Sequence, residues 1–164
     1  MMSAFTRFPS GETSEKQPSF LVIGYGNPLR GDDGIGQKVA EIVETWDLPN
    51  IGALPVHQLM PELAETITAV DGVIFVDAQM ATESEAKIQV QVLSPSQSPG
   101  LQFGHYLTPG TLLTWAETLY QIVPQAWLIS VPATDFTLRD CLSEQGEAQV
   151  QAVLEIIEQI VNHF

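Results

Sequence analysis

Short apolar runs of strand length alternate with amphipathic segments of helical period along most of this chain. Residues 19–26, 71–78 and 126–132 are apolar runs that end at glycine, proline or polar residues, a pattern typical of buried strands. Residues 34–46 and 108–120 repeat apolar side chains at helical spacing. Alternating strands and helices predict an α/β fold, in which helices cover both faces of a largely parallel sheet.

Four further segments complete this pattern, with strands expected at 54–59 and 87–92 and helices at 61–70 and 147–164. Residues 87–92 alternate strictly between polar and apolar side chains, which indicates a half-exposed strand at the edge of the sheet. In the helix at 108–120, Thr108 is the expected N-cap and Pro109 occupies the first turn. The side chains of this helix expected to point inward are Leu112, Leu113, Ala116, Leu119 and Tyr120.

Length and composition indicate one domain, residues 19–164, preceded by a flexible extension at residues 1–18. The extension is rich in small and polar residues and lacks the apolar region of a signal peptide. Twenty acidic against six basic residues give a net charge of −14, which disfavours nucleic acid and anionic membranes as partners. Cys141 is the single cysteine, so no disulfide forms within one chain, which fits a reducing cytoplasm.

Residues 24–36, which read GYGNPLRGDDGIG, form a glycine-rich turn that begins like a phosphate-binding loop. A dinucleotide fingerprint needs glycine where the chain has Leu29, and a phosphate loop needs Lys and Ser or Thr where it has Asp32 and Asp33. Two carboxylates repel phosphate, so the turn is suited to a cation. The alternative is that Asp32 or Asp33 caps the helix that begins near Gly34.

Polar side chains that could carry chemistry follow the ends of the expected strands, where ligands bind in open α/β sheets. Asp33, Asp77 and His105 are of the types that bind a borderline divalent ion such as nickel or zinc, and three ligands leave room for a substrate. His57 is a fourth candidate. Strand-end aspartates are also common caps, and loop histidines are often surface residues, so spacing alone leaves both interpretations open.

Several motifs in order give the chain a more specific resemblance. GYGNPLRGDDGIG is followed by HQLMPELAE, VIFVDA, GHYLTPGTLL and VPATDF. This series resembles the [NiFe]-hydrogenase maturation endopeptidases, over about residues 20–160. The resemblance implies a single domain with three layers (α/β/α) around a twisted, mainly parallel five-stranded sheet, and allows one antiparallel edge strand.

The resemblance also implies an activity and a set of site residues. Such an enzyme removes the C-terminal extension of the hydrogenase large-subunit precursor after nickel insertion, and recognises the bound nickel. The family's nickel contacts carry over to Asp33, Asp77 and His105, with Asp32 as the alternative acid. Gly31, Asp32 and His57 are expected to contact the substrate. Nickel arrives in the precursor and is sensed rather than tightly held, and the free protein is expected to be a cytoplasmic monomer.

Some features depart from the family or stay open. The family often has Glu where this chain has Asp33, and residues 137–143 (TLRDCLS) differ from relatives that carry Gly and Glu there. The peptide bond could be attacked by water at a metal-polarised carbonyl, or with Asp33 or Asp32 as general base. Both a bidirectional NAD-linked and an uptake hydrogenase fit as the target. Other functions are a nickel-binding chaperone without proteolysis and an unrelated small hydrolase on the same fold.

Overall fold

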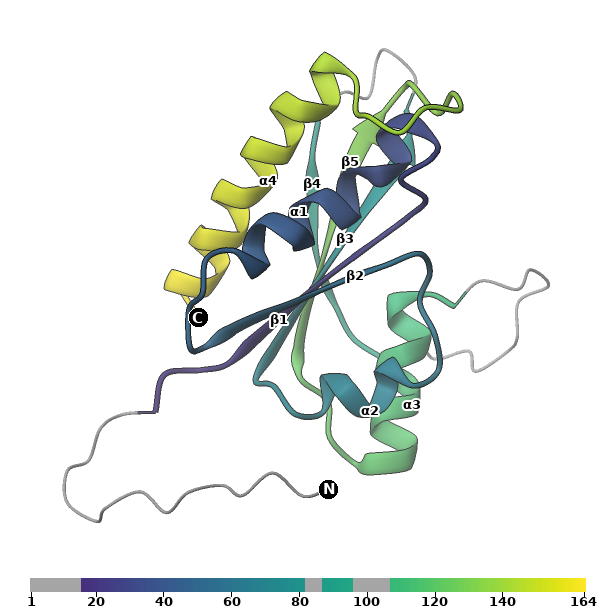
Figure 1. The fold of residues 1–164 in the computed structure, drawn as a ribbon. Helices are drawn as coiled ribbons and strands as arrows, with labels where there is room; N and C mark the ends of the chain where they lie inside the picture. Colours follow the sequence, from purple (N-terminus) through teal and green to yellow (C-terminus); the bar gives the residue numbers. More distant parts are fainter. Residues whose placement is uncertain (1–15, 82–86, 96–106) are drawn as a thin grey trace, which may run out of the picture.

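The computed structural model describes residues 16–81, 87–95 and 107–164, and five strands of this part form one sheet in the order β2-β1-β3-β5-β4 (Figure 1). The strands are β1 (Phe20–Tyr25), β2 (Ile51–Val56), β3 (Gly72–Met80), β4 (Gln89–Leu93) and β5 (Gln125–Ala133). The helices are the short 3-10 turn η1 (Gly31–Gly34), α1 (Ile35–Glu44), α2 (Leu63–Ile67), α3 (Pro109–Tyr120) and α4 (Glu144–Asn162).

The pairing of the strands confirms the predicted fold class. Strands β2, β1, β3 and β5 are parallel, and β4 pairs antiparallel with the outer side of β5. The predicted edge strand is thus present, but it is more exposed than expected, since the apolar Val90 and Val92 are 46% and 61% exposed. The expected strand at 54–59 lies earlier in the chain as β2, because Ile51–Leu54 also pair with β1.

Helices α1 and α4 cover one face of the sheet, and α2 and α3 cover the other (Figure 1). Side chains of β3 alternate between two buried clusters, as the period of a strand requires. Ile74 and Val76 pack in the cluster beneath α1 and α4, while Val73 and Phe75 pack in the cluster beneath α2 and α3. This alternation places the side chain of the next odd-numbered residue, Asp77, on the α2 and α3 face.

Helix α3 begins as predicted but is less buried than expected. Thr108 accepts a hydrogen bond from the Thr111 amide at 3.2 Å, and Leu112, Leu113 and Ala116 are fully buried. Leu119 and Tyr120 were wrongly expected to point inward, since they are 67% and 40% exposed.

Two expectations about the chain ends have different outcomes. Helix α4 begins at Glu144 rather than near residue 147, because Ser143 caps it by accepting a hydrogen bond from the Gly146 amide. Most of the expected extension, residues 1–15, lies outside the described residues. No helix among the described residues is long and apolar enough to cross a membrane.

Glycines let α1 lie very close to the sheet. A Cβ added to Gly36 would overlap the backbone carbonyl oxygens of Tyr25 and Val76, and one added to Gly24 would overlap the Gly36 carbonyl. Helix α1 is therefore pressed directly against β1 and β3 at their carboxyl ends. The acidic turn η1, which precedes α1 without a break, is held at the same edge of the sheet.

Replacing Gly36 with Ala should therefore destabilise the fold, because backbone atoms cannot move aside as a flexible side chain can. We expect Gly36→Ala to lower the free energy of unfolding by about 3 kcal/mol in urea titrations. Gly52→Ala is the matched control, since its Cβ would meet only Leu21 Cδ1 at 3.6 Å. Equal stability of the two variants would show that α1 can move away from the sheet without loss.

Candidate active site

The candidate site lies at the carboxyl end of β1 and on the neighbouring part of β3. Asp77 was wrongly expected to end its strand, since β3 continues to Met80 by pairing with β5. Tyr25, the last residue of β1, pairs in register with Asp77 of β3. The two side chains therefore lie on the same face of the sheet, and the Tyr25 hydroxyl donates a hydrogen bond to the Asp77 carboxylate. Asp33 reaches this edge from η1, so one short turn and the strand β3 supply the two carboxylates.

The loop between β1 and η1 is fixed mainly by backbone contacts. Gly26 has a φ of 139°, which favours glycine, and its amide lies 3.3 Å from the Val56 carbonyl oxygen and 3.2 Å from that of His57. Gln37 of α1 donates from Nε2 to the Gly26 carbonyl at 2.8 Å. The Asn27 side chain closes the next turn by accepting a hydrogen bond from the Leu29 amide at 3.0 Å.

The Asp33 carboxylate turns back onto this loop. Its Oδ2 accepts a hydrogen bond from the Asn27 amide at 2.9 Å, and its side chain is half-buried. Neither η1 nor α1 has a side-chain hydrogen bond at its N-cap. The capping alternative for Asp32 and Asp33 is therefore wrong for the helix that follows them.

Among the described carboxylates, Asp77 has the pKa that departs furthest from its ordinary value. Burial raises its pKa from 3.8 to about 6, the charge of Asp33 adds to this increase, and the hydrogen bond from Tyr25 opposes it. Burial and the Asp77 charge also raise the pKa of Tyr25, so its hydroxyl stays a donor. A cation placed between Asp33 and Asp77 would relieve the repulsion of these two carboxylates.

Asp32 has a different environment from its neighbour. Its side chain is 2% exposed, and its two carboxylate oxygens accept hydrogen bonds from the amide and the hydroxyl of Ser143, at 2.8 and 2.7 Å. These contacts direct the Asp32 carboxylate toward the start of α4. The geometry therefore favours Asp33 over Asp32 as the acid available to a ligand, while the expected substrate contact of Asp32 stays a prediction.

The other expected site residues are placed as follows. His57 directly follows β2 and is exposed beside the Gly26 turn. Gly31 is buried, with a φ of 55°, and its amide donates to the Arg139 carbonyl at 3.1 Å. His105 lies outside the described residues. Within residues 16–81, 87–95 and 107–164, no group of three or more His, Cys, Asp or Glu side chains could hold a metal ion.

Tyr25, Gln37 and Ser143 support the site but were not identified from the sequence. Tyr25 had a usable signal, because two parallel strands that start in register place Tyr25, the sixth residue of β1, beside Asp77, the sixth residue of β3. Gln37 is a polar residue on the buried face of α1, 9% exposed, which is also recognisable in a helical pattern. Ser143 gave no such signal, since it lies 111 residues from Asp32.

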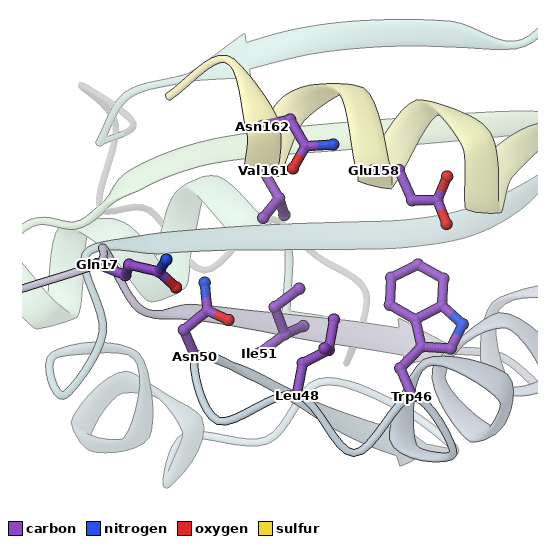
Figure 2. A pocket seen from close by; sticks show the side chains of 8 residues that line it. All are labelled: Gln17, Trp46, Leu48, Asn50, Ile51, Glu158, Val161 and Asn162. Carbon is purple, nitrogen blue, oxygen red and sulfur yellow. The ribbon is translucent and has the colours of Figure 1, made fainter.

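A cavity of about 600 Å³ lies far from these residues, between the end of α4 and the turn that joins α1 to β2 (Figure 2). Strand β2 begins here, so the cavity lies at the amino ends of the strands, whereas the candidate site lies toward their carboxyl ends. Its lining residues are Gln17, Trp46, Leu48, Asn50, Ile51, Glu158, Val161 and Asn162. Glu158 is the single titratable side chain in this set, so the cavity lacks the convergent groups of a catalytic site.

The raised pKa of Asp77 predicts that its charge opposes folding. The folded state binds this proton more tightly than the unfolded chain, so the contribution of Asp77 to stability is lost as the pH rises from about 4 to about 6. Asp77→Asn removes the charge and keeps an acceptor for Tyr25. We expect it to raise Tm at about pH 7 and to have little effect at about pH 4, in thermal melts across this range.

Asp71→Asn is the control of opposite sign. Hydrogen bonds from the amide and hydroxyl of Ser19 lower the pKa of the exposed Asp71 carboxyl, so its ionised form favours folding. Its replacement should lower Tm near neutral pH. A lower Tm for Asp77→Asn at that pH would contradict the electrostatic description of the site.

Known proteins are similar to this chain in sequence and in fold. No protein-family model matches the chain. A curated relative from Methanocaldococcus jannaschii, named as a hydrogenase maturation protease, is 28% identical over 151 residues, which cover 87% of this chain and 96% of the relative.

Solved structures extend the similarity to the whole architecture. The hydrogenase maturating endopeptidase HybD from Escherichia coli has a TM-score of 0.70 and 21% identity, covering 88% of this chain and 93% of its own. The [NiFe] hydrogenase maturation protease HycI from Thermococcus kodakarensis has a TM-score of 0.68 and 22% identity, covering 90% of this chain and 95% of its own. This chain is similar in sequence to a curated hydrogenase maturation protease and similar in fold to solved structures of such proteases, as its motifs predict.

Proposed function

We propose that this protein is an endopeptidase that removes the C-terminal extension of a [NiFe]-hydrogenase large-subunit precursor after nickel insertion. The observation that carries this proposal is the pair of neighbouring carboxylates, Asp33 and Asp77, at the carboxyl edge of a sheet shared with hydrogenase maturation proteases. Ligands bind at this edge in open α/β sheets. The relatives' names supply the substrate, and the residues supply the chemistry.

Nickel enters this proposal as part of the substrate. Asp33 and Asp77 offer oxygen ligands, and His105 would add the imidazole that suits nickel. Two half-buried carboxylates that repel one another gain from a divalent cation, which gives the site a reason to prefer a nickel-loaded precursor. A site of one imidazole and two carboxylates should hold free nickel loosely, so the ion is sensed rather than retained.

The chain's own groups suit proton transfer during peptide hydrolysis. Asp77, with a pKa of about 6, exchanges a proton readily near neutral pH, which is the requirement for a general base. Tyr25 orients Asp77, and the Asn27 amide orients Asp33. Nickel bound in the precursor would supply a Lewis acid next to the scissile carbonyl. Attack by a water molecule, with one of these carboxylates accepting its proton, is the mechanism that we favour.

The surface charge bears on the partner and the compartment. A net charge of −14 favours a precursor that presents basic residues near its extension, and long-range attraction of this kind weakens as salt rises. We propose that the protein works in the cytoplasm, where the precursor receives its metal, and that it is a monomer between encounters.

Removing the charge of Asp33 should abolish processing without loss of the fold. Asp33→Asn keeps an oxygen that can accept from the Asn27 amide, so the loop geometry survives. We expect cleavage of nickel-loaded precursor to slow by about 100-fold or more, measured as a size shift on gels. Asp77→Asn and His105→Ala should have similar effects, while the same change at the exposed Asp47, beyond α1, should have none. A fully active Asp33→Asn protein would remove Asp33 from the mechanism.

The same assay separates the proposed activity from other functions. Wild-type protein mixed with nickel-loaded precursor should release a short C-terminal peptide, and mixed with nickel-free precursor should release none. A nickel-binding chaperone would bind the precursor and leave its mass unchanged. A hydrolase of unrelated substrate would neither bind nor cleave it.

Cys141 provides a test of the kind of protease. It is exposed, in the segment between β5 and α4. Its backbone carbonyl accepts a hydrogen bond from Arg139 Nε at 3.2 Å, and its side chain also interacts with the Arg139 guanidinium. We expect Cys141→Ser to process precursor at the wild-type rate and thiol alkylation to leave activity intact. Loss of cleavage with an unchanged Tm would instead assign a cysteine nucleophile.

A further inference from the structure

The Asp32 carboxylate forms a contact that the proposed chemistry does not use. It is 2% exposed and is bound at both oxygens by Ser143, which lies 111 residues away in sequence. Ser143 is also the N-cap of α4, where its hydroxyl oxygen accepts from the Gly146 amide at 3.0 Å. One hydroxyl group therefore joins the acidic turn η1 to the last helix of the chain.

The surroundings of this contact are built around a negative charge. Asp32 lies at the N-terminus of a nineteen-residue helix, where the helix dipole stabilises anions. A Cβ added to Gly146 would overlap Asp32 Oδ1, so the helix approaches the carboxylate as closely as a glycine allows. The charge of Asp32 is thus accommodated by α4 and is not shared with the pair formed by Asp33 and Asp77.

Backbone hydrogen bonds extend the same connection along the loop. The Asp32 amide donates to the Asp135 carbonyl at 2.8 Å, and the Gly31 amide donates to the Arg139 carbonyl at 3.1 Å. The Arg139 amide donates in turn to the Leu29 carbonyl at 3.0 Å. Residues 29–32 are therefore bound to the segment between β5 and α4.

Asp33 is the residue whose position depends on this connection. Its Cα is one peptide unit, about 3.8 Å, from that of Asp32, and its carboxylate binds the Asn27 amide on the other side of the turn. We infer that Ser143 is a positioning residue, which through Asp32 holds the turn so that Asp33 stays beside Asp77. This inference rests on the proposed function for its effect on catalysis, but its structural part stands apart from it.

The test compares variants that break or keep the contact. Ser143→Ala removes the hydroxyl, and Ser143→Thr keeps it. Asp32→Ala removes both acceptors, and Asp32→Asn keeps an oxygen for the Ser143 amide. We expect the two alanine variants to lower kcat for cleavage of nickel-loaded precursor about tenfold or more with little change in KM, since a small displacement of a reacting group is costly. The Ser143→Thr variant should retain most of the activity.

Val153→Ala is the matched control for a general loss of stability. Val153 is fully buried in α4, ten residues beyond Ser143. Its replacement weakens the packing of the same helix and leaves the contact of Ser143 with Asp32 in place. At an equal decrease in Tm it should leave kcat unchanged. If Val153→Ala lowers kcat as much as Ser143→Ala does, the role of Ser143 is only to stabilise α4 and the inference is wrong.

Hydrogen exchange supplies a measurement that does not depend on cleavage. The Asn27 amide donates to Asp33 and the Asp32 amide to Asp135, so their exchange rates report whether the turn stays in place. Ser143→Ala should speed exchange at both amides and leave β1 protected, and unchanged rates would overturn the inference whether or not the wild type cleaves precursor. An inactive but fully folded Asp32→Asn protein with normal exchange would also overturn it, by assigning Asp32 a direct contact with the substrate.

Discussion

The repulsion between Asp33 and Asp77 is the constraint around which the carboxyl edge of the sheet is organised. Two half-buried carboxylates destabilise the folded chain, and burial makes the effect larger for Asp77. The fold keeps them close because each is held by a different part of the backbone. The register of β3 with β1 places Asp77, and hydrogen bonds of the turn at Asn27 and at Asp32 place Asp33. Binding a cation would relieve this repulsion. The apolar clusters on the two faces of the sheet supply the stability that offsets it.

The two adjacent aspartates show how one short motif can serve two purposes. Asp32 is buried and bound by Ser143. Asp33 is half-buried, and its charge acts on Asp77 of β3. A helix N-terminus neutralises the first charge, so the second is the one left available to a ligand. The glycines of the motif have a related role, because α1 can approach β1 and β3 only where Gly24 and Gly36 leave out a side chain. The motif thus places helix α1, the turn η1 and the Asp33 carboxylate at the end of β1.

The sequence alone was sufficient for the class of fold and for the edge where the carboxylates gather, since both follow from local periodicity and from the rule that parallel strands end together. It was insufficient where an outcome depended on distant residues. The exposure of Leu119 and Tyr120 depends on which segments pack beside the last turn of α3, and the pattern of α3 itself does not contain that information. The partner of Asp32 is Ser143, at the start of α4, and no spacing rule links this residue to the motif. The contribution of His105 stays a prediction, because that residue lies outside the described part.

The contact between Asp32 and Ser143 also has a consequence for the order of events during synthesis. The sheet neighbours of the turn are complete once β3 has been made, but the residue that binds Asp32 emerges much later, just before the final helix. Contacts of such long sequence separation form late in folding, because the loop between them must close first. A ribosome-bound chain that has passed β5 therefore presents both aspartates without the fastening between them and α4. With the role that we infer for Ser143, the turn takes its final position only after the start of α4 has been made.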